Sequence, residues 1–160
     1  MANDGGLVAI LAQWMVDILK ALKYNNVNVF KTADIWKHQV GATEGGMEKS
    51  IAYSPFAFVS AGDEDTAREG DNDLRRIPDF RVFIGVDSKE DGVAQWGDAN
   101  HLGTSKIRDL VIDLFEKERP ADPTITCDEF YYVGGLEILD QPKRHWIRLD
   151  FEVSQLNIES

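Results

Sequence analysis

Four side chains in this 160-residue chain are of the types that most often do chemistry: three histidines, His38, His101 and His145, and the single cysteine Cys127. The histidines show neither the H-x-x-x-H nor the H-E-x-x-H spacing that turns two imidazoles toward one zinc ion. A lone cysteine provides neither a thiolate cage nor an intramolecular disulfide. We therefore expect no metal site, no cofactor site and no catalytic residue. His145 should be a hydrogen-bonded structural histidine.

Carboxylates gather in the segment 62–73, and their oxygens are of the kind that bind hard cations. Their order does not match an EF-hand loop, which needs acids at alternating positions, then a glycine and a closing glutamate. The segment has little apolar content, so we expect a solvated loop outside the sheet. Its acids are Asp63, Glu64, Asp65, Glu69, Asp71 and Asp73.

A second interpretation of the polar residues stays open. His38 and His101 both lie in glycine-bearing segments, where they could meet in space beside the acidic segment. Such a cluster would make the chain a small binding module or a metal-dependent enzyme. Against this interpretation, no glycine-rich stretch has the spacing of a phosphate-binding loop, and neither Ser54 nor Ser60 lies in a nucleophile elbow.

The elements that must position these residues follow from hydrophobic spacing. Apolar residues at intervals of three and four predict helices at about 6–23 and 104–118, the second capped by Thr104 or Ser105. Apolar or alternating runs predict strands at about 27–31, 55–61, 78–86, 130–139 and 145–153. Gly134 and Gly135 predict a β-bulge in the fourth strand, and turn residues at 140–144 predict a hairpin. A flexible loop or ribbon is expected at 37–50, and a polar loop at 87–103.

This order of elements, α-β-β-β-α-β-β, predicts the α+β class. We expect a largely antiparallel or mixed sheet of about five strands with both helices packed on one face. A chain of 160 residues is long enough to bury one core, so a single domain over 1–160 is expected.

The last predicted strand alternates for nine residues and so has two distinct faces. Its apolar face should be core, and its mixed aromatic and charged face is the candidate surface for a neighbouring subunit. That second face holds Trp146, Arg148, Asp150 and Glu152. Trp96, in the 87–103 loop, is either an aromatic anchor in an interface or a side chain that folds back over the sheet edge.

The net charge of the chain excludes some partners. It carries 17 basic and 28 acidic residues, a formal charge of −11, which repels phosphate backbones. Sequence-tolerant nucleic-acid binding is therefore not expected. No run of eighteen apolar residues predicts a membrane span, and the N-terminal stretch lacks the basic region of a signal peptide. Synthesis in the cytoplasm is the expectation that follows.

The whole pattern resembles the tail terminator, or tail completion, proteins of tailed bacteriophages and prophages, which are related to the neck proteins of the head-tail joint. The resemblance is carried by the N-terminal helix 7–22, the strands 53–59 and 80–84, the helix 107–115 and the closing strand 146–153. It implies a small α+β protein without catalytic residues that forms a hexameric ring in the virion. Its implied partners are further copies of itself, the major tail tube protein and the head connector. The acidic segment would then face the lumen or a basic neighbour.

Overall fold

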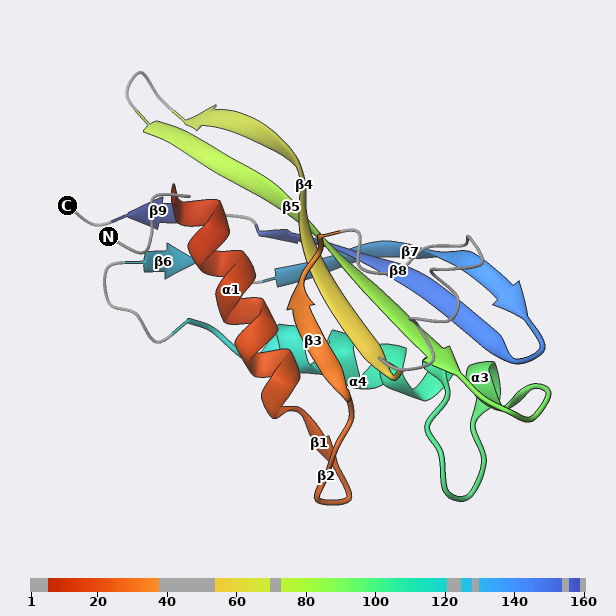
Figure 1. Cartoon of the computed structure of the whole chain (residues 1–160). Helices are drawn as coiled ribbons and strands as arrows, with labels where there is room; N and C mark the ends of the chain where they lie inside the picture. Colours follow the sequence, from red (N-terminus) through yellow and green to blue (C-terminus); the bar gives the residue numbers. More distant parts are fainter. Residues whose placement is uncertain are drawn as a thin grey trace.

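The computed structural model describes residues 6–37, 54–69, 73–120, 125–127, 130–153 and 156–158 (Figure 1). The predicted loop at 37–50 therefore lies almost entirely outside the described residues. In chain order the elements are α1 (Gly6–Ala21), β1 (Lys23–Tyr24), β2 (Val27–Asn28), β3 (Thr32–Ile35), β4 (Phe56–Glu69), β5 (Asp73–Asp87), α3 (Val93–Trp96), α4 (Thr104–Lys117), β6 (Ile125–Cys127), β7 (Phe130–Gln141), β8 (Arg144–Val153) and β9 (Leu156–Ile158).

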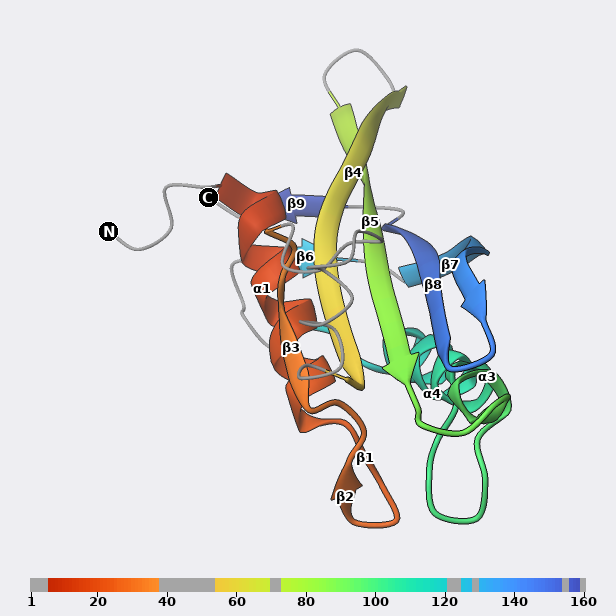
Figure 2. The same ribbon diagram turned by 45° about the vertical axis from the view of Figure 1, so that its right-hand side comes forward.

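One mixed sheet organises the chain. Its main strands lie in the order β3, β4, β5, β8, β7, which Figure 2 shows from left to right. β3 runs parallel to β4, and the other pairings are antiparallel. Long β5 pairs with β8 along its second half, from Asp79 to Asp87, and with β9 at Arg76; β9 also pairs with β6. The predicted α+β class with a mixed sheet is confirmed.

Both long helices pack on the same face of this sheet. The fully buried side chains of α1 include Leu11, Met15 and Leu19, and those of α4 are Ile107, Val111 and Phe115 with Thr104. They form one cluster with the sheet residues Val82, Ile84, Leu149 and Phe151. The spacing of three and four that predicted the helices is the spacing of these contacts. The centre of the α1 stripe is Met15, whereas Trp14 and Ile18 are only partly buried.

The opposite face of the sheet carries a separate aromatic cluster. Phe56 stacks on Phe58 with ring centroids 5.1 Å apart and meets Trp146 edge-on at 5.7 Å. Gly85 lies beneath these rings, where an added Cβ would stand 2.2 Å from Phe56. Trp146 is 5% exposed, so the expectation that its ring faces a neighbouring subunit is wrong. The aromatic residues of β4 bury it within the chain.

The predicted first strand at 27–31 is confirmed only for its first two residues, which form β2. Asn25 and Asn26 adopt left-handed backbone angles, φ 53° and 65°, and make the two-residue turn of the small β1–β2 hairpin. Asparagine pairs favour this turn because the residue tolerates positive φ. Val29 and Phe30 are buried in the core outside any strand, and the chain enters the sheet only at β3.

The acidic segment is part of the sheet, which corrects the expected loop at 62–73. β4 continues through Glu69 and β5 begins at Asp73, with a register shift between Ala61 and Glu64. A β-ribbon satisfies its backbone hydrogen bonds without a core, so polar residues can form it. Figure 1 shows the end of this hairpin projecting beyond α1. It contains Asp63, Glu64, Asp65, Glu69 and Asp73, while Asp71 lies outside the described residues.

The remaining local predictions have mixed outcomes. The hairpin joining β7 to β8 is confirmed, with Gln141 paired to Arg144, and so is a bulge in β7, between Tyr132 and Gly134. The predicted cap of α4 is wrong, because Gly103 is the N-cap and no side chain caps the helix. The 87–103 segment, expected to be a loop, contains the short helix α3.

In the part of the chain that is described, no helix has the length and apolarity to cross a membrane.

Candidate functional site

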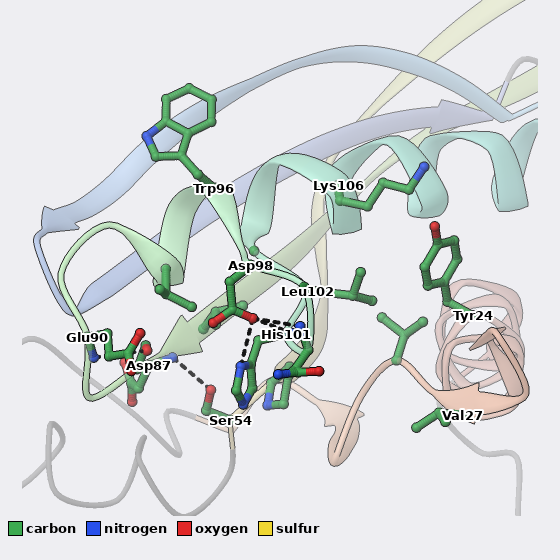
Figure 3. A pocket seen from close by; sticks show the side chains of 18 of the residues that line it. Tyr24, Val27, Ser54, Asp87, Glu90, Trp96, Asp98, His101, Leu102 and Lys106 are labelled. Carbon is green, nitrogen blue, oxygen red and sulfur yellow. Dashed lines mark hydrogen bonds and ion pairs between the residues drawn. The ribbon is translucent and has the colours of Figure 1, made fainter.

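A groove of about 940 Å³ lies between the β1–β2 hairpin and the loop that joins α3 to α4 (Figure 3). In this loop a carboxylate oxygen of Asp98 accepts hydrogen bonds from the backbone N–H groups of Asn100 and His101, both 2.8 Å long. The same oxygen lies 2.9 Å from Nδ1 of His101. The bond from Asn100, then that from the His101 ring, lowers the pKa of Asp98. Asp98 and His101 thus order an exposed turn.

The groove does not assemble the alternative site proposed from sequence. His38 lies outside the described residues. The loop that holds His101 and the hairpin that holds the acidic segment lie at opposite ends of the molecule in both views (Figures 1 and 2). Because the two are separated, His101 and the described acids of that segment do not form one metal or catalytic centre.

Trp96 lies at the rim of the groove. Its side chain is 70% exposed, and Figure 3 shows its ring pointing away from Asp98 and His101. The expectation that it folds back to cover the sheet edge is therefore wrong, and its role as an interface anchor stays a prediction. On the other side of the groove, Nζ of Lys106 lies 5.3 Å from the ring centre of Tyr24, which links α4 to β1.

The open face of β8 keeps two of the charged residues proposed for an interface in one fixed arrangement. Nε of Arg148 donates to Oδ1 of Asp150 at 2.9 Å, and Nη2 donates to Oδ2 at 3.0 Å. Both side chains are about a quarter exposed, which leaves the paired groups at the surface. The register places Leu136 beside Arg148, and Tyr131 beside Glu152, on this same face.

Strand β7 forms the outer edge of the sheet next to this face. Within the described ranges β8 is its only strand partner. It presents four large apolar side chains to solvent, and we call them the β7 edge residues. They are Tyr131, Val133, Leu136 and Ile138, which are 49, 60, 46 and 44% exposed. A long apolar edge strand is a template for pairing with another chain.

A second, smaller cavity of about 330 Å³ lies between the start of α4 and the β7–β8 hairpin. His145 lines it and is 3% exposed, and its Nδ1 contacts Oγ1 of Thr104. The prediction of a hydrogen-bonded structural histidine is confirmed on this side of the ring. Its Nε2 is buried and makes no hydrogen bond among the described residues. Oε1 of Glu137 lies 3.7 Å from this nitrogen.

Glu137, Asp140 and His145 are the group of described residues able to hold a metal ion, with one donor atom each and all three atoms within 4.8 Å of one another. The sequence pattern alone does not indicate this group. The two-residue turn between Gln141 and Arg144 would have placed Asp140 opposite His145. A regular strand, however, would put Glu137 and Asp140 on opposite faces. Only a register shift at Ile138, which has no residue signature of its own, brings them together.

No protein-family model matches this chain, and a search of curated proteins likewise finds no match. The function is therefore inferred from the sequence pattern and from the surfaces described above.

Proposed function

We propose that this chain is a non-enzymatic structural subunit that assembles into a ring in the virion of a tailed bacteriophage or prophage. In this role it resembles the tail terminator, which closes the tail tube and joins it to the head. The α+β fold with both helices on one sheet face supports the proposal, because the element order that carries the resemblance is the order of the main elements of the chain.

The β7 edge residues are the observation that carries the proposal. A monomer rarely leaves four large apolar side chains exposed along one edge strand, since each would stabilise a contact by leaving water. In a ring, β7 of one subunit would meet a different surface of the next, a head-to-tail contact that closes by rotation. Pairing of β7 with itself would instead give a two-fold dimer, so the size of the assembly separates the two arrangements.

Charge supports the same role. A net charge of −11 gives a ring little affinity for DNA phosphates, which suits a channel through which DNA must slide. The β4–β5 hairpin, whose sequence is rich in acids, projects from one end of the subunit, where it would line the lumen or meet a basic partner (Figure 1). A neck protein of the head-tail joint would use the same features and is the alternative role.

The test is the mass of the assembly and its binding to tails. Native mass spectrometry and negative-stain microscopy of the full chain should show a ring of about six copies, alone or on purified tail tubes. Variants that neutralise the acids of the β4–β5 hairpin should form the ring but lose tail length control or DNA passage. A chain that stays monomeric at high concentration and never associates with tail tubes would overturn the proposal.

A further inference from the structure

The end of the β7–β8 hairpin gathers three metal-binding side chains by its register. Asp140 pairs directly with His145, and Glu137 pairs with Ile147, two residues further along β8 on the same face as His145. The register shift between Glu137 and Leu139 inserts Ile138 and turns Glu137 to the face of Asp140. Bulges often re-aim side chains in this way beside functional sites.

His145 is oriented as a metal ligand would be. Metal-bound histidines usually donate one ring N–H to a protein oxygen, which fixes the ring and leaves the other nitrogen free to bind. Here Oγ1 of Thr104, 1% exposed, is the oxygen beside Nδ1. Nε2 is buried, lacks a hydrogen bond within the described chain and faces Glu137. A buried polar nitrogen without a partner costs free energy, and a bound cation would remove that cost.

From this geometry we propose that Nε2 of His145 and the carboxylates of Glu137 and Asp140 bind one divalent transition-metal ion of the zinc class. One imidazole and two carboxylates suit Zn²⁺, whereas Mg²⁺ prefers six oxygens. The two carboxylates balance the charge of the ion. Water completes the coordination, since three protein ligands leave a tetrahedral position open.

Only the two carboxylates need to move. Ligand atoms around tetrahedral zinc lie about 3.4 Å apart, given bonds of about 2.0–2.1 Å. The three donor atoms already lie within 4.8 Å, and both acids are exposed and so free to rotate toward the fixed imidazole. The ion would fasten the bulged part of β7 to β8 and, through Thr104, to the start of α4. All three ligands belong to one chain, so binding of the ion does not depend on ring formation.

The experiment is calorimetric titration of the full chain with ZnCl₂ after treatment with chelator. We expect one ion per chain with micromolar or tighter affinity, and at least 100-fold weaker binding of MgCl₂. Glu137→Gln and Asp140→Asn keep side-chain size at exposed positions, and each should weaken zinc binding tenfold or more. Co²⁺ should give the intense visible absorption of a tetrahedral site with wild type and lose it with both variants.

The matched control is the other histidine–carboxylate pair of the described chain, Asp98 and His101, which is exposed. Asp98→Asn and His101→Gln should leave the zinc affinity unchanged. Asp17→Asn, at an exposed acid of α1, controls for weak binding to a negative surface. Unchanged zinc affinity in both Glu137→Gln and Asp140→Asn, or binding only at millimolar zinc, would overturn the site and show that Glu137 is simply an ion-pair partner of His145.

Discussion

The hydroxyl oxygen of Thr104, the first residue of α4, contacts Nδ1 of His145 on β8 in the interior of the protein. Thr104 and His145 are 1 and 3% exposed. The contact fastens the start of the helix to the sheet and takes the hydroxyl away from the capping role that its position suggests. It also selects which nitrogen of His145 faces the cavity.

Replacing Thr104 with valine should destabilise the protein by about 1–3 kcal/mol, because the shape is kept but Nδ1 of the buried imidazole loses its partner. Thr104→Ser keeps the hydroxyl and should lower the free energy of unfolding by less than Thr104→Val does. Urea denaturation followed by circular dichroism measures both. If valine and serine cost the same, the methyl group and not the hydrogen bond is what this position contributes.

Gly85 should not tolerate alanine. The added Cβ would lie 2.2 Å from Phe56 and 2.7 Å from Trp146, so the aromatic cluster must shift, at a cost of about 1–3 kcal/mol. Phe56→Leu makes room, so the double variant Gly85→Ala/Phe56→Leu should be more stable than the sum of the single effects predicts. A double-mutant cycle by chemical denaturation measures this coupling. Strictly additive effects on the free energy of unfolding would mean that there is no steric conflict between the two side chains.

Asp98 should titrate at a lower pH than an ordinary aspartate, because the backbone N–H of Asn100 and the ring of His101 favour its charged form. A depressed folded-state pKa adds stability that is present above the unfolded pKa and is lost as the pH falls through the folded value. The turn should therefore loosen in acid. Carboxyl NMR titration measures the pKa, and amide exchange at Asn100 and His101 should rise in Asp98→Asn at neutral pH. An ordinary Asp98 titration would contradict the assignment.

The sequence predicts those elements whose pattern reports burial directly. The spacing of Ile107, Val111 and Phe115 predicted α4 because these residues all face one core. The extension of the β4–β5 hairpin has polar residues on both faces and hence no such signal, so its sequence predicts a loop. Trp146 shares a strand face with Arg148. Its burial, however, depends on Phe56, which lies on β4, far away in the sequence.

The candidate sites follow the same rule. Arg148 and Asp150 were placed on the correct sheet face, because strand alternation fixes the face of a side chain. The exposure of the apolar residues of β7 does not follow from the sequence, since a nearly continuous apolar run is typical of a strand that is covered on both faces. Glu137 was missed because the shift at Ile138 reverses the face that alternation assigns to it.

Changing both Arg148 and Asp150 to alanine should weaken assembly tenfold or more while leaving the monomer nearly as stable, within about 1 kcal/mol. The two groups already satisfy each other, so removing both leaves no unpaired charge. Sedimentation velocity across a concentration series measures assembly, and thermal melting measures stability. Equal losses of both would show that the pair supports the fold and not an interface.

Val133→Lys tests the β7 edge itself. Val133 is 60% exposed in the bulge between Tyr132 and Gly134, so lysine can extend into solvent without disturbing the monomer core. A charge on an edge strand opposes pairing with another chain. We expect the ring to dissociate to monomers with an unchanged melting temperature. Val27→Lys is the matched control, because Val27 is 67% exposed on the β1–β2 hairpin, far from β7 in the sequence. This substitution should leave the ring intact. Rings that survive Val133→Lys but not Val27→Lys would move the subunit interface from β7 to the end of the molecule that holds the groove.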